Sequence, residues 1–160
     1  MAQLDIAPAP ADVLLNTDGW DGYPSSRDRL LGFIGERQVS DVVVLTGDIH
    51  TSWVNDLKAD FADPASATLA TEFVGTSISS DGDGADTGLG GALAPGNPHI
   101  KFFSNRRGFV QCSLTRDQWR TDFQEVPYVT LPGAPLATRD TFVVESGRAG
   151  ADQVGGAPML

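Results

Sequence analysis

Val42-Val-Val-Leu-Thr-Gly-Asp-Ile-His50 is the stretch from which the fold class can be predicted. Residues 42–45 form a continuous apolar run rich in β-branched side chains, which is typical of a buried strand in a sheet covered on both faces. The preceding segment, Arg27 to Gln38, carries an apolar stripe at helical spacing. We therefore expect a helix there, capped by Ser25 or Ser26, followed by a strand of an α/β fold.

Further strands are expected on the carboxyl side of this stretch. Thr68 to Thr76 is one candidate, and Gly108 to Leu114 alternates between apolar and polar residues. Trp119 to Phe123 alternates in the same way, and the polar residues 115–118 lie between the two segments. This pattern predicts an antiparallel hairpin in the C-terminal part of the chain.

The remaining segments are rich in turn-forming residues. Residues 77–97 are dominated by Gly, Asp and Ser and predict a long loop, while Thr141 to Val144 predicts one short strand. The last residues offer little to bury, so that we expect them to fray. The expected organisation is one partial domain over residues 1–147 and a flexible tail over residues 148–160.

Composition excludes several classes of protein. The 160 residues suit one domain, and 11 basic against 21 acidic residues give a net charge of −10, which disfavours a nucleic-acid-binding surface. No apolar run approaches the roughly 18 residues that a membrane span needs. The N-terminal residues of this chain predict no signal peptide. A single cysteine, Cys112, excludes an internal disulfide and a multi-thiolate zinc site.

Gly47-Asp48-Ile49-His50 is the sharpest chemical signal in the chain. It directly follows the expected buried strand, where α/β sheets place their ligand sites. In extended backbone the side chains of Asp48 and His50 project from the same face, and both are ligands for transition metals. The alternative is a capping aspartate and a hydrogen-bonded histidine at a strand end, and the motif by itself leaves both interpretations open.

Longer segments extend this signal. Val43-Val-Leu-Thr-Gly-Asp-Ile-His-Thr-Ser-Trp53 resembles the metal-binding signature of the PhoD-type alkaline phosphatases, a branch of the calcineurin-like metallophosphoesterases. The same family is resembled, in the same order, by residues 1–5, 20–24, 72–80, 97–103, 107–109, 118–123 and 126–128. The resemblance runs from residue 1 to about residue 147.

The resemblance implies a fold, an activity and a set of site residues. The expected fold is the C-terminal portion of a two-sheet α/β sandwich, loop-rich, around a centre of iron and calcium that hydrolyses phosphate mono- and diesters. Asp48 and His50 match the metal ligands of the Gly-Asp-x-His motif. Trp53 and Asn55 lie just beyond it as candidate pocket residues, although packing is the better interpretation for Trp53.

Other candidates are weaker. Arg106 and Arg107 are either phosphate contacts or an exposed pair at the edge of the hairpin. The segment Asp81-Gly-Asp83-Gly-Ala-Asp86 lacks the glycine and glutamate positions of a calcium loop, so that we expect a solvated, flexible turn. Cys112 is expected to be a small buried hydrophobic residue, and His99 a structural one.

The family's remaining metal ligands lie in motifs upstream of the segments present here, which leaves two hypotheses. In the first, the chain supplies part of a phosphoesterase site, acts on a phosphate ester and needs a missing N-terminal half. In the second, it is a non-catalytic remnant or a partner-binding fragment with an open sheet edge. Members of the family are typically exported to the periplasm or the cell exterior.

Overall fold

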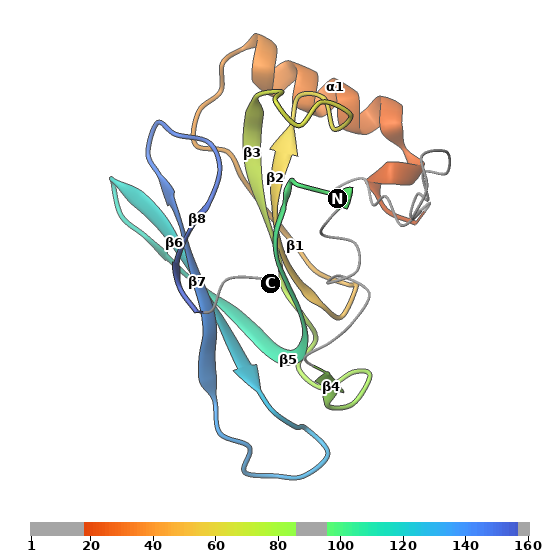
Figure 1. The fold of residues 1–160 in the computed structure, drawn as a ribbon, viewed down its shortest axis with the longest axis vertical. Coiled ribbons are helices and arrows are strands. Elements are labelled where there is room, and N and C mark those ends of the chain that lie inside the picture. The colour runs from red at the N-terminus through yellow and green to blue at the C-terminus, as the bar shows by residue number, and fades with distance from the viewer. Residues whose placement is uncertain (1–17, 86–95, 157–160) are drawn as a thin grey trace.

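The computed structural model describes residues 18–85 and 96–156, and the strands among them form one open mixed β-sheet (Figure 1). No helix among these residues is long and apolar enough to cross a bilayer. The elements are, in chain order, the 3-10 helix η1 (Trp20–Gly22), α1 (Pro24–Glu36), β1 (Val43–Thr46), β2 (Ser52–Lys58), β3 (Thr68–Val74), β4 (Gly84–Ala85), β5 (Ile100–Leu114), β6 (Gln118–Val126), β7 (Ala137–Glu145) and β8 (Asp152–Gly155).

The sheet has the strand order β1-β3-β2-β5-β6-β7-β8, and β4 pairs with β5 beside this path. β1 and β3 run parallel, with Val43 opposite Thr71, whereas the other neighbouring strands are antiparallel. Because β1 and β3 are parallel, their carboxyl ends lie at the same end of the sheet. That end is remote from α1 in Figure 1.

The sheet has two halves, β1–β3 and β6–β8, and β5 connects them. With 15 residues it is long enough to pair with a strand of each half. Its first residues pair with β2, with Phe103 opposite Trp53, and its last residues pair with β6, with Val110 opposite Phe123. Gly108 is at the junction, where an added Cβ would lie 1.9 Å from the carbonyl oxygen of Gln124. A side chain at this position would therefore separate β5 from β6.

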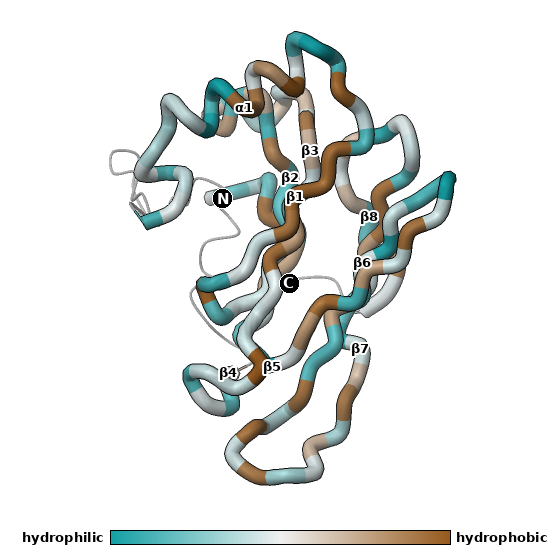
Figure 2. Tube along the Cα trace, turned by 180° about the vertical axis from the view of Figure 1, so that it is seen from behind, coloured by the Kyte–Doolittle hydropathy of each residue, from teal (hydrophilic) through white to brown (hydrophobic). Residues whose placement is uncertain are grey.

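Apolar side chains fill both faces of the β1–β3 half, along which the apolar residues are concentrated in Figure 2. One cluster joins this half to β6 and β7 and consists of the buried residues Val54, Phe73, Phe102, Phe123, Phe142, Val144 and Ala151. A second cluster holds α1 against the sheet and consists of Leu31, Ile34, Leu57 and Ala70. The helix therefore covers the face opposite to the one that packs on β6 and β7.

Most of the expected elements are present, with shifted bounds. The helix begins at Pro24 rather than at Arg27, and no side chain caps it, so that the expected Ser25 or Ser26 cap is wrong. Proline suits the first helical position because the backbone N–H that it lacks would have no helical partner there. The strand predicted at 42–45 is β1, one residue later, but the expectation that it is buried is wrong: none of its residues is buried and Leu45 is 55% exposed, because among the described residues β1 has a neighbouring strand on one side only. The strand predicted at 68–76 is β3, two residues shorter.

Three features differ from the sequence analysis. β2 was not predicted, since six of its seven residues are buried and it shows no alternation. β8 pairs with β7 inside the segment expected to be a flexible tail, which corrects that expectation for Asp152–Gly155. β4 lies within the expected long loop, of which residues 86–95 fall outside the described residues. The two-sheet sandwich stays a prediction.

Candidate functional site

The candidate site lies at the carboxyl ends of the parallel strands β1 and β3. Residues 47–51 lead from β1 to β2, and residues 75–83 lead from β3 to β4. The two segments are joined by Thr76, whose hydroxyl lies 3.0 Å from the carbonyl oxygen of His50 and 2.9 Å from that of Arg106 and shares its one proton between them. The parallel pairing of β1 and β3 is what brings residues 26 positions apart in sequence into contact.

Asp48 and His50 both lie just beyond the carboxyl end of β1, but their backbone is not extended. Their φ angles are 75° and 58°, which is the left-handed region, so that the expectation of extended geometry is wrong. The reason is topological: β1 and β2 pair with opposite sides of β3, and residues 47–51 must turn across the end of that strand. Asp48 is exposed and His50 is partly exposed.

His50 has a partner that the spacing of residues could not indicate. Its Nδ1 atom lies 2.7 Å from Oδ2 of Asp81, a residue 31 positions further along the chain. An ionised carboxylate can only accept, so the imidazole donates its Nδ1 proton in this bond. Both side chains reach solvent, with 40% of His50 and 69% of Asp81 exposed.

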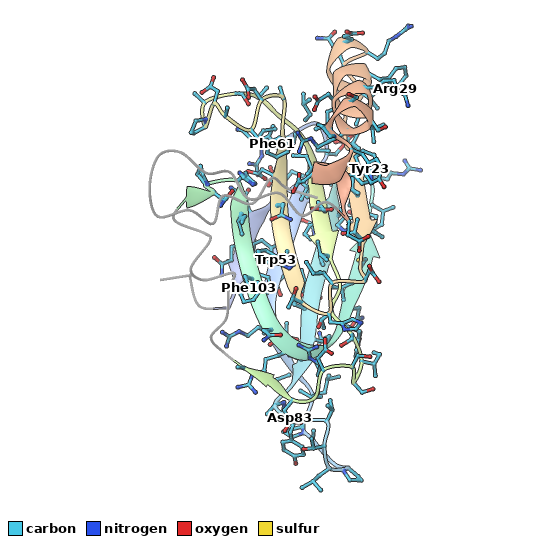
Figure 3. All side chains as sticks on the ribbon, turned by 90° about the vertical axis from the view of Figure 1, so that its right-hand side faces the viewer. Tyr23, Arg29, Trp53, Phe61, Asp83 and Phe103 are labelled. Carbon is cyan, nitrogen blue, oxygen red and sulfur yellow. The ribbon has the colours of Figure 1, made fainter. Side chains whose placement is uncertain are left out.

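The loop that carries Asp81 is exposed, but it is hydrogen-bonded to a distant segment of the chain. Asp83 accepts hydrogen bonds from the backbone N–H groups of Val129 (2.7 Å) and Thr130 (3.0 Å), and Figure 3 shows it at the far end of the sheet. The bond from Val129, more than any other contact, lowers the pKa of the Asp83 carboxyl. The expected solvated turn is confirmed for residues 81–83, and the bonds of Asp83 show in addition that this turn is joined to residues 129–130.

Trp53 and Asn55 are buried in β2. Trp53 lies beside Phe103 (Figure 3) and packs edge-on against it, with ring centroids 4.6 Å apart. Its Nε1 donates to the Thr51 hydroxyl at 2.7 Å. Asn55 donates from Nδ2 to Oε2 of Glu72 at 2.9 Å. The packing interpretation of Trp53 is confirmed, whereas a role of either residue in a pocket stays a prediction.

Arg106 and Arg107 differ from each other. Arg106 is partly buried and donates to the carbonyl oxygen of Pro127 at 3.0 Å. Arg107 is fully buried, and its guanidinium binds Ser77, Ser80 and Asn105. The interpretation of the two as an exposed pair is therefore wrong for Arg107, whose two terminal nitrogens are occupied by the protein itself.

Five carboxylate side chains are buried among the described residues, and the sequence analysis missed all of them; Glu72 and Asp21 have the lowest exposed fractions together with Asp140. Glu72 lies in β3, fully buried, and accepts from the Thr46 hydroxyl at 3.2 Å; its position as a single charge within an apolar strand was the available signal. Asp21 lies 2.7 Å from Nη1 of Arg27. Burial raises the pKa of Asp21 to about 6, against the opposing effect of the Arg27 guanidinium.

Cys112 is exposed, which corrects the expectation that it is a buried hydrophobic residue. It lies in the second half of β5, where the described residues provide a neighbouring strand on one side only. His99 is buried and packs edge-on against Phe61, with ring centroids 5.2 Å apart, as expected of a structural residue.

The described residues fit a metal ion only in part. No three His, Cys, Asp or Glu side chains within residues 18–85 and 96–156 lie close enough together to hold one. Asp48 and His50 nevertheless provide an exposed carboxylate and an imidazole whose Nε2 is not the atom bound by Asp81. These donors suit calcium and iron respectively, and further ligands would have to come from other residues.

Comparisons with known proteins agree on one family. The model of the PhoD-like phosphatases matches residues 1–123. Alkaline phosphatase D from Bacillus subtilis (strain 168) is 43% identical over 145 residues, which is 90% of this chain and 25% of that protein. A solved structure described as the structure of PhoD has a TM-score of 0.91 and 40% identity, and the match covers 99% of this chain and 30% of that one. The chain thus spans between a quarter and a third of the length of these relatives.

Proposed function

Because the chain belongs to the PhoD-like phosphatase family, we propose that it supplies part of the active site of a metal-dependent phosphoesterase, of the alkaline phosphatase D type, acting on phosphate mono- and diesters. The observation that carries the proposal is the position of the Gly-Asp-x-His motif. It lies within the segment that the family model matches and at the edge where two parallel strands end. Ligand sites of α/β sheets form at such edges.

In this proposal Asp48 and His50 are ligands of a centre that contains iron and calcium. Asp48 and His50 would hold part of this group, which when bound would supply charge neutralisation of the phosphate ester and acidification of water. The chain's own contribution is to hold the two side chains at one edge, with the His50 ring fixed through Nδ1 and its carbonyl oxygen bound by Thr76. Asn55 and Arg106 are candidate pocket or phosphate contacts in this proposal, and Trp53 contributes packing against Phe103.

The remaining ligands would come from polypeptide that packs beside β1, completing the two-sheet sandwich of the family. Among the described residues β1 pairs only with β3, so that its other edge is open. Leu45 in this strand is 55% exposed, and Ile49 just beyond it is 41% exposed. An open edge with exposed apolar side chains supports a covering segment. The same observation favours the second candidate function, a non-catalytic fragment that binds a partner. If the chain is part of such a phosphoesterase, we propose by analogy with the family that the protein is exported to the periplasm or the cell exterior.

A chimaera tests the proposal directly. This chain would replace the matching 145-residue segment of the Bacillus subtilis alkaline phosphatase D, and hydrolysis of an aryl phosphate monoester and a diester would be measured with iron and calcium present. We expect turnover in the chimaera, and its loss in the His50→Ala and Asp48→Asn variants. The expected loss in kcat/KM exceeds about 100-fold, the upper end of the effect typical for an outer-shell partner of a metal ligand.

Asp28→Asn is the matched control for Asp48→Asn, because the Asp28 side chain is 68% exposed on α1 at the opposite end of the sheet. The 160-residue chain by itself is expected to be inactive, since two ligands do not fix the geometry of a metal centre. Full activity of the His50→Ala chimaera would overturn the proposed role of the motif. An inactive chimaera that is folded and metal-loaded would favour the partner-binding fragment.

A further inference from the structure

We infer that Asp81 is a positioning residue for His50: its carboxylate accepts a hydrogen bond from Nδ1–H, which keeps the ring proton on Nδ1 and leaves Nε2 as the unprotonated, ligand-binding nitrogen. Only one part of this inference rests on the proposed function, namely that Nε2 binds a metal ion. The tautomer itself is a property of this chain and can be measured without metal or substrate.

The contact has the geometry of a charge-assisted hydrogen bond. Nδ1 of His50 and Oδ2 of Asp81 are 2.7 Å apart, within the range of such bonds. A neutral imidazole carries one proton, on either nitrogen, and an ionised carboxylate has no proton to give. The pair therefore selects the Nδ1–H tautomer, and the lone pair lies on Nε2, on the side of the ring away from the carboxylate.

An exposed pair of this kind would contribute little if both residues were mobile. The residue before Asp81 is fixed by the buried Arg107, whose Nη1 donates to the carbonyl oxygen of Ser80 (2.8 Å) and to the hydroxyl of Ser77 (3.0 Å). Its Nη2 donates to the carbonyl oxygen and Oδ1 of Asn105, at 3.0 and 2.7 Å. The guanidinium thus ties the loop to β5 directly before Asp81.

The loop is fixed again after Asp81. Gly84 pairs with Arg106 of β5, and an added Cβ on Gly84 would lie 1.7 Å from the carbonyl oxygen of Asn105. Asp83 is bonded to the backbone N–H groups of Val129 and Thr130. Asp81 therefore lies between two anchored points, in a left-handed conformation with φ of 69°.

His50 is held from its own side as well. Its φ is 58°, and its carbonyl oxygen accepts from the Thr76 hydroxyl at 3.0 Å. Both partners thus have fixed backbones, and the hydrogen bond between their side chains costs little additional ordering. A second partner on the imidazole of a metal ligand fixes both its tautomer and its orientation, which is the role assigned here to Asp81.

The test is histidine NMR, which is favourable because the chain contains two histidines, His50 and His99. The 160-residue chain would be labelled with ¹⁵N-histidine and kept free of metal at about pH 8.5, well above the usual histidine pKa of about 6.5. Long-range ¹⁵N–¹H correlations distinguish the two tautomers. We expect His50 to be mainly Nδ1–H in the natural chain, and mainly Nε2–H, as in free histidine, in Asp81→Ala.

Asp83→Asn is the matched control. It removes one negative charge from the same loop but keeps an oxygen that can accept from Val129, so that we expect the His50 tautomer to be unchanged. The signals of buried His99 report whether each variant is folded. If the free chain proves unfolded, the same measurement applies within the chimaera described above.

Two outcomes would overturn the inference: a natural chain in which His50 is mainly Nε2–H, or an Nδ1–H tautomer that survives in Asp81→Ala. Neither outcome bears on whether the chimaera hydrolyses phosphate esters. Conversely, an inactive chimaera with the expected tautomer would overturn the proposed function and leave the pairing of Asp81 and His50 intact.

Discussion

The two halves of β5 belong to one continuous strand, but their surroundings are different. In residues 100–107 the side chains of Phe102, Ser104 and Arg107 are buried, whereas in residues 109–114 Phe109 is 42% exposed and Leu114 is 72% exposed. Only the second half alternates in sequence in a way that favours a strand, yet the first half is the more deeply buried one. Alternation therefore predicts that a strand exists, but not which of its faces another layer will cover.

The two halves of β5 differ in burial because they have different neighbours. The first half pairs with β2, and Phe102 packs against Phe123 and Phe142 across the molecule, with ring centroids 4.8 and 5.6 Å apart. The second half pairs with β6 and is a sheet edge among the described residues. One half is thus stabilised mainly by apolar burial and the other mainly by its backbone pairing.

The largest expected effect is the loss of Phe102. Phe102→Ala should reduce the free energy of unfolding by about 3–5 kcal/mol, because it leaves a cavity in the cluster that joins the two halves of the sheet. Phe109→Ala removes the same atoms from the exposed half and should reduce it by only about 1 kcal/mol. Urea denaturation of both variants measures the difference, and equal losses would mean that the two halves are covered alike.

The elements that can be predicted from the sequence are those with a local pattern of apolar residues, and the others depend on distant partners. The apolar runs of β1 and β3 and the stripe of α1 are local signals, and these elements form within a few residues of their expected positions. β2 gives no local signal, because a strand buried on both faces shows no alternation. β8 contains little to bury and forms because β7 provides a partner. Such partner-dependent strands cannot be found from local pattern.

The candidate site shows the same limit. Asp48 and His50 could be singled out because the motif directly follows a strand, but their left-handed backbones and the bond to Asp81 depend on the order of strands in the sheet. Arg107 could not be recognised as an anchor, since its partners Ser77 and Ser80 lie about 30 residues earlier. Local sequence thus indicates the chemistry of the site, and topology decides its geometry.

A second prediction concerns the point where the two halves of β5 meet. Gly84→Ala places a Cβ 1.7 Å from the carbonyl oxygen of Asn105, whereas a Cβ on Gly82 meets no atom within 4 Å. Both glycines have similar positive φ angles, 70° and 69°, so that each substitution costs about 1–2 kcal/mol for its backbone conformation. The clash should add about 1–3 kcal/mol for Gly84 alone. Urea denaturation compares them, and equal costs would show that the loop is not held against β5.

A third prediction uses pH to probe the half of the sheet beside residues 109–114. Asp122, opposite Gln111, is bound by Arg120 and by the Thr141 hydroxyl, and the bond from Arg120 is the largest of the effects that lower its pKa. A lowered pKa stabilises the folded state above the unfolded value of about 3.9, and this contribution disappears as the pH falls through the folded value. Asp122→Asn should therefore be less stable than the natural chain at pH 7, by at most about 1 kcal/mol for a solvent-screened pair. The gap should narrow as the pH falls below about 3.9 and close once the pH is below the folded pKa of Asp122, and a gap that is the same at every acidic pH would assign it to packing.

The smallest effect is expected at Cys112, in the most exposed part of β5. A thiol in a packed core would be protected from reagents and costly to replace, as the alternation of this strand led us to expect. Since Cys112 is exposed and its sulfur lies 3.8 Å from the Thr121 hydroxyl, Cys112→Ser should change the free energy of unfolding by less than about 0.5 kcal/mol. The native thiol should also react with an aromatic disulfide reagent at about pH 8 nearly as fast as it does in urea. Strong protection of the native thiol, or a loss of stability comparable to that of Phe102→Ala, would show that another layer covers this half of the strand and that the two halves of β5 are equivalent after all.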